Sequence, residues 1–213
     1  MMMRHTPFAV AATLVLALSL AACSSGPGDP NADFAAKLEA ERAAKDAAFR
    51  RQVNQPIPAA RMDELLPLRY FPADPAYVVP ASFAPAAART PLQIPTSTGQ
   101  IRAMEVVGTL EFTLKGQALS LGALAEAGTP PDRLFVPFMD LTSGTETYEA
   151  GRYLEITRTV TGIYTIDFNR AFQPYCAYNH DYDCPFPPAS NRLLVPVRAG
   201  EKLAHSTLPA AGR

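Results

Sequence analysis

Proline content is the property of this chain that most limits its possible folds. The sequence contains 21 prolines in 213 residues, roughly twice the usual share, and they are spread along the chain rather than grouped in PxxP repeats. A proline has no backbone N–H, so it ends or kinks a helix and is confined to edges, bulges and first positions in a sheet. This distribution favours short strands and loops over long helices.

One proline-free segment is the exception, and it predicts a helix over residues 33–54. It is rich in alanine and straight-chain residues, Asp33 is a candidate N-cap, and Glu41 stands four residues before Lys45, the spacing of a helical ion pair. An apolar stripe, which Lys45 interrupts, contains Phe34, Leu38, Phe49 and Val53. Such a helix either packs against the domain or serves as a spacer or partner-binding helix.

After about residue 65 the pattern is typical of strands. In "AMEVVGTLEFTL" one parity is apolar: Met104, Val106, Leu110, Phe112 and Leu114. Lys115-Gly116-Gln117 is predicted to turn the chain back into "ALSLGAL", and Pro137 predicts that "RLFVPFMD" is an edge strand or carries a bulge. The predicted fold is mainly β (α+β): an antiparallel β-sandwich or partly open barrel over residues 55–205, with one N-terminal helix and long Pro-rich loops. Residues 206–213 are predicted to be a disordered tail.

The segment "GRYLEITRTVTGIYTIDFNRA" predicts a hairpin with the three-residue loop 160–162, in which Gly162 is left-handed. This register places the apolar residues on one face: Leu154, Ile156, Tyr164, Ile166 and Phe168. A two-residue loop would mix apolar and acidic groups on both faces. The chosen register also places Glu155 opposite Asp167, and like charges there repel unless a cation or a shared proton intervenes. The candidates are a bound metal or one of Arg152, Arg170 and Arg192.

The N-terminus resembles an export signal. Arg4 and His5 precede an apolar run, 8–22, which at about fifteen residues is shorter than a membrane-spanning helix and fits a signal peptide. It ends in Leu20-Ala21-Ala22-Cys23, similar to the lipobox of bacterial lipoproteins, which implies a signal peptide over 1–22 and acylation of Cys23. An ordinary secreted signal is the alternative.

If Cys23 is acylated, the lipid bilayer is a partner of this protein, because two acyl chains anchor a protein stably. The Gly/Pro/Ser-rich residues 23–32 are then a flexible tether. Ser24, rather than Asp, favours the outer membrane over the inner membrane. We therefore expect a lipid-anchored protein of the cell envelope, on the periplasmic face of the outer membrane.

Two further cysteines, Cys176 and Cys184, flank "AYNHDYD". In an exported protein a disulfide is the favoured interpretation, and by chain entropy so short a loop contributes roughly 2.6 kcal/mol. A zinc site would use Cys176, His180, Asp183 and Cys184, but it lacks the C-x2-C pairs of structural sites. A catalytic thiol would need an activating base. No metal and no cofactor is predicted.

Three strings occur in order in the C-terminal third: "FMDLTSGTETYEAGRYL", "DFNRAFQPYCAYN" and "CPFPPASNRLLVPVRAGEK". Together they resemble the bacterial family labelled domain of unknown function 1684, closely over 138–202 and more loosely through "LRYFPADPAYVVPASF". The chain departs from the family motif at Gln173, where Asn is usual, and at Asn179-His180, where Asn-Pro is usual. The family has no assigned activity, so the resemblance implies motif positions rather than a reaction.

From these motif positions we predict a small polar pocket for a small polar ligand or an envelope protein. Its residues are Asp140, Thr142, Ser143, Thr147, Tyr148, Arg152, Asp167, Asn169, Asn191, Arg192 and Glu201; Gly144, Gly151 and the two cysteines also match the motif. In an alternative interpretation, Arg152 and Arg192 pair with the carboxylates and have a purely structural role. A serine hydrolase is disfavoured, because Ser143-Gly144 lacks the G-x-S-x-G elbow and no motif position holds a histidine.

Two functions therefore remain open: a binding or scaffold module, and an envelope hydrolase with Asp140 or Asp167 as general base. An enzyme would require a concave site in which at least two of the carboxylates have no arginine partner. Nucleic acid is not expected as a partner, because the formal net charge is −1 and no basic stretch is interleaved with aromatic residues.

Overall fold

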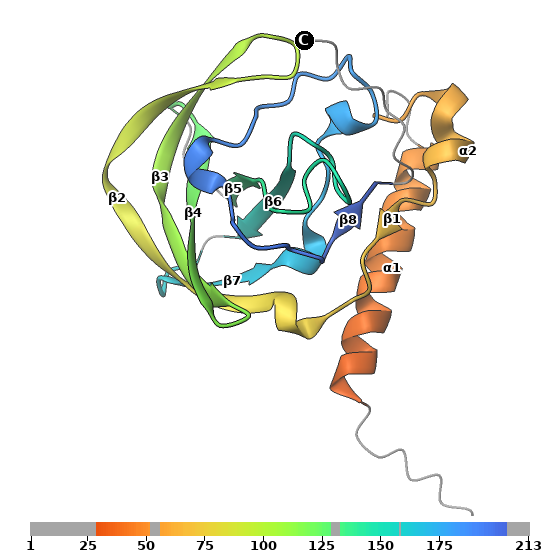
Figure 1. The fold of residues 1–213 in the computed structure, drawn as a ribbon, viewed down its shortest axis with the longest axis horizontal. Helices are drawn as coiled ribbons and strands as arrows, with labels where there is room; N and C mark the ends of the chain where they lie inside the picture. Colours follow the sequence, from red (N-terminus) through yellow and green to blue (C-terminus); the bar gives the residue numbers. More distant parts are fainter. Residues whose placement is uncertain (1–28, 52–55, 129–132, 158, 204–213) are drawn as a thin grey trace, which may run out of the picture.

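A six-stranded antiparallel sheet curls into a nearly closed barrel in the computed structural model, which describes residues 29–51, 56–128, 133–157 and 159–203 (Figure 1). In spatial order its strands are β6 (Arg152–Thr157), β5 (Arg133–Phe138), β4 (Gln117–Glu126), β3 (Ile101–Leu114), β2 (Val78–Pro95) and β7 (Ile163–Asp167). The short strands β1 (Arg69–Tyr70) and β8 (Glu201–Lys202) pair separately. The helices are α1 (Pro30–Arg51) and α2 (Met62–Leu65), with single 3-10 turns at Ala59–Arg61, Pro75–Tyr77, Phe168–Arg170, Tyr175–Ala177 and Ala189–Asn191. The mainly β prediction is confirmed, and the architecture is the barrel.

Helix α1 begins three residues earlier than predicted. Asp29 caps it by accepting a hydrogen bond from the Asn31 N–H at 2.9 Å, and Pro30 takes the first helical position, where its missing N–H costs nothing. The N-cap prediction for Asp33 was therefore wrong, and Asp33 lies in the first turn. Residues 23–28 of the predicted tether and 52–54 of the predicted helix lie outside the described residues.

Helix α1 packs along the outside of the barrel beside β1 (Figure 1). Leu38 and Phe49 are buried there, so the packed-helix alternative holds. The predicted pair of Glu41 with Lys45 was wrong, because both side chains have partners in the barrel domain. Lys45 Nζ lies 2.5 Å from Glu201 Oε1, and Glu41 bonds Arg170 at 2.9 Å. Lys45, which interrupts the apolar stripe, thus makes an ionic contact with the buried carboxylate of Glu201.

The turn between β3 and β4 is confirmed. Leu114 pairs with Gln117, and the two residues between them, Lys115 and Gly116, have φ values of 48° and 81°. Two left-handed residues in a two-residue loop match the right-handed twist of the flanking strands.

A β-bulge divides the apolar parity of β3 between two clusters. Val106 pairs with Leu124, whereas Gly108 pairs with Ala123, so one extra residue of β3 is accommodated between them. Such a bulge exchanges the faces on which same-parity residues lie. Leu110, Phe112 and Leu114 consequently lie in the barrel core, while Met104 packs in a separate cluster with Ile94 and Leu124. The alternation correctly predicted a strand, but the apolar residues before and after the bulge lie on opposite faces of it.

The predicted hairpin of β6 and β7 was wrong. These strands lie at opposite edges of the sheet; β7 pairs with β2, with Val78 opposite Asp167, and β6 pairs with β5. Strand β2 is 18 residues long and forms a separate ladder with β7. Strands β6 and β7 therefore approach each other only where the barrel nearly closes. Nearby, Tyr153 of β6 exchanges backbone hydrogen bonds of 2.8 and 3.0 Å with Phe172, which lies beyond the end of β7.

The facing predicted for this segment is nevertheless confirmed. Leu154, Ile156, Tyr164, Ile166 and Phe168 all lie in the barrel core, and Gly162 is left-handed with a φ of 73°. The apposition of Glu155 and Asp167 was wrong. Glu155 bonds Arg133 at 3.0 Å, and Asp167 pairs with Arg170. Each carboxylate thus has its own arginine, and no shared cation is required.

Pro137 does not mark an edge, because β5 lies between β4 and β6. The β4–β5 ladder consists of the pair Leu124 and Phe135, and beyond it the Asn191 side chain occupies the gap between the strands. Its Oδ1 accepts from Gly122 N at 2.7 Å, and its Nδ2 donates to the carbonyls of Gly122 and Pro137 at 2.8 Å each. The Asn191 amide therefore supplies a donor where Pro137 has no backbone N–H.

Residues 193–203, here called the C-terminal segment, pack against the barrel core. Its alternate residues Leu193, Val195, Val197 and Ala199 are buried in the core, and the Leu141 N–H donates to the Val195 carbonyl at 3.2 Å. The apolar run 8–22 and the tail 204–213 lie outside the described residues. Among the helices that are described, none is long and apolar enough to cross a bilayer.

Candidate functional site

Asp140 and Arg152 form a buried ion pair with a distance of 2.6 Å, and each side chain is 1% exposed. Arg152 Nη2 also donates to the Val197 carbonyl at 2.7 Å, and Nη1 donates to the carbonyls of Ala199 and Glu201. Burial lowers the pKa of Arg152, and the carboxylate of Asp140 opposes that effect. The guanidinium thus joins the first residue of β6 to the C-terminal segment.

The loop after Asp140 is held by its own residues. Asp140 Oδ1 accepts from the backbone N–H of Thr142 at 2.6 Å and from its hydroxyl at 2.5 Å. The Thr142 and Thr147 hydroxyls lie 3.0 Å apart, and Ser143 Oγ accepts from Asp140 N at 3.2 Å. These hydroxyls and amides, which the sequence offered as ligand groups, are occupied within the loop.

Asp167 and Asn169 form a second network, at the end of β7. Asn169 exchanges two hydrogen bonds of 2.9 Å with the backbone of Asp74. Asp167 Oδ1 accepts from the backbone N–H of Asn169 at 2.9 Å, and its Oδ2 pairs with Arg170. This network fixes the turn that leads into β2.

Glu201 is the centre of a third network. It is 1% exposed. Its Oε2 accepts hydrogen bonds from the Tyr178 hydroxyl at 2.5 Å and from Gln173 N at 2.9 Å, and its Oε1 accepts one from Lys45 Nζ. Burial is the main reason why the pKa of Tyr178 is raised, followed by the charge of Glu201. Glu201 thereby connects α1, β8 and the segment after β7.

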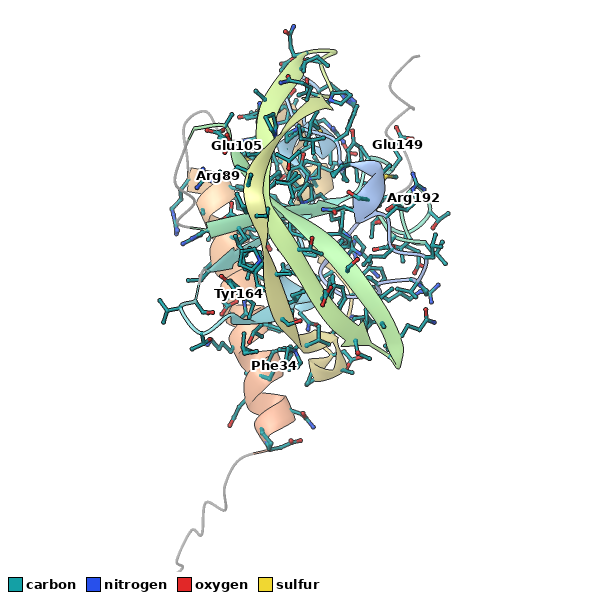
Figure 2. The ribbon with its side chains drawn as sticks, turned by 90° about the vertical axis from the view of Figure 1, so that its left-hand side faces the viewer. Phe34, Arg89, Glu105, Glu149, Tyr164 and Arg192 are labelled. Carbon is teal, nitrogen blue, oxygen red and sulfur yellow. The ribbon has the colours of Figure 1, made fainter. Side chains whose placement is uncertain are left out.

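The predicted polar residues therefore lie in separate networks and not in one pocket. Asp140, Asp167 and Glu201 each have a cationic partner. Asn191 belongs to the β4–β5 gap, Tyr148 packs beside Cys176 and Cys184, and Arg192 projects at the surface (Figure 2). The geometry that a general base at Asp140 or Asp167 requires, an unpaired carboxylate in a concave site, is not present at either residue.

A different site opens beside the barrel. It is a cleft of about 540 Å³, and five aromatic side chains among the described residues line it: Phe135, Tyr153, Phe172, Tyr175 and Tyr182. Phe135 and Tyr153 meet edge to face with ring centroids 4.8 Å apart, as do Tyr175 and Tyr182 at 5.3 Å. This volume and this apolar lining are those of a small-molecule site. We call it the aromatic cleft.

The β3 bulge provides the floor of the aromatic cleft. Met104 and Leu124, which the bulge separates from the barrel core, line it together with Phe135. One wall is the segment 172–185, which contains the loop between the two cysteines. The sequence signal for this wall was the aromatic density of "FQPYCAYNHDYDCPF", but only the fold brings it opposite β4 and β5.

Four of the five charged side chains that line the cleft form two ion pairs, and the fifth is Glu126. Arg102 binds Asp183 at 2.8 Å, and Arg133 binds Glu155 at 3.0 Å. Asp183 also accepts from the Thr98 hydroxyl at 2.5 Å, and the hydrogen bonds from the hydroxyls of Thr96 and Thr98 are the main reason for its lowered pKa. The rim is therefore polar and the interior apolar, a combination that orients an amphiphilic ligand.

Cys176 and Cys184 are free, buried thiols in this structure, and Cys184 lines the cleft. The Cys176 N–H donates to Cys184 Sγ at 3.2 Å. A hydrogen bond from the Cys184 thiol lowers the pKa of Cys176 to about 7, and the same contact raises the pKa of Cys184. The two side chains are thus in contact. Among the described residues, no group of three or more His, Cys, Asp or Glu side chains could hold a metal ion.

Comparisons with known proteins agree with this architecture. The chain is 36% identical to an uncharacterised protein of Haloarcula marismortui with a known solution NMR structure; the match covers 81% of this chain and 95% of that one, with a TM-score of 0.64. A search of curated proteins found no match. The family model described as "Protein of unknown function (DUF1684)" matches residues 64–202, which extends the resemblance seen in the C-terminal third. The chain therefore belongs to the DUF1684 family.

Proposed function

We propose that this protein is a lipid-anchored binding module of the cell envelope and that the aromatic cleft is its ligand site. The observation that carries the proposal is an open cavity of about 540 Å³ with an aromatic lining. The polar groups of the sequence motifs are occupied in structural networks, which argues against hydrolysis at those residues.

The lining indicates the chemistry of the ligand. Aromatic rings and the apolar floor favour a flat or chain-like apolar group, since they offer surface rather than hydrogen bonds. The paired charges at the rim favour a polar end that remains near solvent. A small amphiphile fits both features.

Replacing Phe135 with serine tests this assignment. The change removes one aromatic wall, and we expect the affinity for N-phenyl-1-naphthylamine to fall by about tenfold, the equivalent of about 1.4 kcal/mol. The dye's fluorescence enhancement on binding measures the affinity, and the chain contains no tryptophan to interfere.

Phe34→Ser is the matched control. Phe34 is also half-buried, but it lies on α1 and does not line the cleft (Figure 2). Its substitution should leave dye binding unchanged. Absence of dye binding by the natural protein, or an equal loss in both variants, would remove the cleft as the ligand site.

Anchoring through Cys23 rests on the lipobox-like Leu20–Cys23. Only residues 24–29 separate Cys23 from α1 at Pro30, and α1 packs on the barrel instead of standing as a stalk. The acylated residue would therefore hold the barrel close to the bilayer surface, and we place this surface at the periplasmic face of the outer membrane.

The same proposal includes a disulfide between Cys176 and Cys184. Both side chains are buried and joined by a thiol hydrogen bond, and oxidation in an envelope compartment would join two such sulfurs. The bond would fix the cleft wall that the loop between them forms.

Mass spectrometry of protein purified from membranes tests both modifications. We expect a mature N-terminus at Cys23 with a mass increase of acyl chains, and peptides of Cys176 and Cys184 that react with iodoacetamide only after reduction. Cys23→Ser should remain unacylated and leave the membrane fraction. An unmodified Cys23 in membranes, or free thiols before reduction, would contradict the corresponding part of the proposal.

A further inference from the structure

Glu126 is the one charged side chain of the aromatic cleft that has no ion-pair partner among the described residues. It is the last residue of β4, and it is exposed. It pairs with Met104 of β3 and shares a face of β4 with Leu124, two residues earlier. Met104 and Leu124 belong to the floor of the cleft. The carboxylate therefore lies at the end of that floor, where a ligand can reach it.

The lining of the cleft carries an excess of one negative charge. Each of its two arginines already holds a carboxylate: Arg102 binds Asp183 at 2.8 Å, and Arg133 binds Glu155 at 3.0 Å. None of these four side chains has a second ionic partner in the part of the chain that the structure describes. With Glu126 the lining has three anions against two cations. A ligand with one positive charge would balance them.

The aromatic rings of the lining favour the same sign of charge. The face of an aromatic ring attracts cations. Phe135 and Tyr153 stand at an interplanar angle of 76°, and Tyr153 and Phe172 at 88°, so the rings face in more than one direction. Lys45 of α1 lies 5.2 Å from the centroid of Phe172. No cation of the described residues lies over the ring of Phe135, Tyr153 or Tyr175.

The sheet brings the unpaired carboxylate and one of these rings close together. Phe135 of β5 pairs with Leu124, so it is the diagonal cross-strand neighbour of Glu126. Such neighbours are separated by about 7–8 Å. One cationic group can therefore contact both the carboxylate and the ring.

We propose that the ligand of the aromatic cleft is an amphiphilic organic cation, with its ammonium group between Glu126 and Phe135 and its apolar part over the floor. This inference rests on the proposed binding function and adds the charge of the ligand to it. A quaternary ammonium suits the site, because its methyl groups pack on ring faces and its charge requires no hydrogen-bond acceptor.

Displacement of N-phenyl-1-naphthylamine from the natural protein tests the sign of the charge. Octyltrimethylammonium bromide and sodium octyl sulfate have the same chain length and opposite charges, and both are used below the concentrations at which they form micelles. We expect the cation to displace the dye at a concentration at least tenfold lower than the anion does. Added salt should reduce this difference, because it screens exposed charges. Equal displacement by the two, or stronger displacement by octyl sulfate, would overturn the proposal.

Glu126→Gln separates the charge of the site from its shape. The substitution keeps the size of an exposed side chain that has no ion pair to lose, so the fold does not depend on it. We expect the affinity for octyltrimethylammonium to fall by about tenfold, while the affinity for the uncharged dye stays the same. Glu111→Gln is the matched control: Glu111 is exposed on the neighbouring strand β3 and does not line the cleft. This variant should bind both compounds as the natural protein does.

The ligand charge and the ligand site fail in different ways. If the dye does not bind, or if Phe135→Ser binds it as well as the natural protein does, the cleft is not the ligand site and both proposals are wrong. If the dye binds in the cleft but Glu126→Gln retains its full affinity for octyltrimethylammonium, only the assignment of a cation is wrong.

Discussion

Arg152→Met is expected to lower the free energy of unfolding by about 4 kcal/mol, because removing one partner of a buried ion pair leaves the other charge uncompensated. The Asp140 side chain is 1% exposed, so water cannot solvate its carboxylate in place of the lost guanidinium. The carbonyls of Val197, Ala199 and Glu201 lose their donor as well. A loss of this size is a large part of the total stability of a domain.

Urea denaturation followed by circular dichroism measures this loss. Arg133→Met is the control: it removes the first residue of β5 from an ion pair whose side chains are 66% and 50% exposed, for which at most about 1 kcal/mol is expected. If both variants lose the same small amount, the Asp140–Arg152 pair does not hold the C-terminal segment.

A double-mutant cycle separates the ion pair from the loss of packing. Asp140→Asn keeps an oxygen for the two bonds from Thr142 but removes the negative charge. Combined with Arg152→Met it should restore part of the lost stability, with a coupling of roughly 2 kcal/mol. Purely additive effects would show that the two side chains act independently.

Asn191→Ala is expected to cost about 3–5 kcal/mol. The Asn191 side chain, which is fully buried, satisfies the N–H and carbonyl of Gly122 and the carbonyl of Pro137, and each buried group left without a partner costs about 1–3 kcal/mol. No backbone group can substitute, because Pro137 has no N–H and the β4–β5 ladder does not extend to this point.

Two further variants test whether the lost hydrogen bonds cause the destabilisation of Asn191→Ala. Asn191→Asp keeps the size and the acceptor but loses the donor to both carbonyls, so it should be at least as destabilising as alanine. Asn179→Ala removes one bond, to Asp181 N at 3.0 Å near the surface, and should cost less than about 1 kcal/mol. Equal stability of Asn191→Asp and the natural protein would show that the amide donor is not needed.

Local patterns predicted the local features of this fold well. The alternation in β3, the turn at Lys115-Gly116, the left-handed Gly162 and the common face of Leu154 and Tyr164 depend on residues close in sequence. The helix was found from propensity, and its start was misplaced because Asp29 and Pro30 together form a better cap than Asp33.

Long-range pairings were predicted poorly. The sequence indicated a β6–β7 hairpin, but β7 obtained its ladder from β2, which lies more than 80 residues earlier in the chain. The motif residues lie in separate networks, and partners such as Lys45 for Glu201 come from distant segments of the chain. The only sequence signal for the aromatic cleft was the aromatic density of residues 172–186, which did not indicate what lies opposite them.

By itself the sequence determined the strand-rich class, the single long helix, the family and the facing of most core residues, because hydrophobic periodicity and turn chemistry act over a few residues. The tertiary structure alone decided which strands pair, which carboxylates receive a cation and where cavities remain. These depend on one bulge in β3, one asparagine between β4 and β5 and one lysine of α1, whose effects appear only when distant segments come into contact.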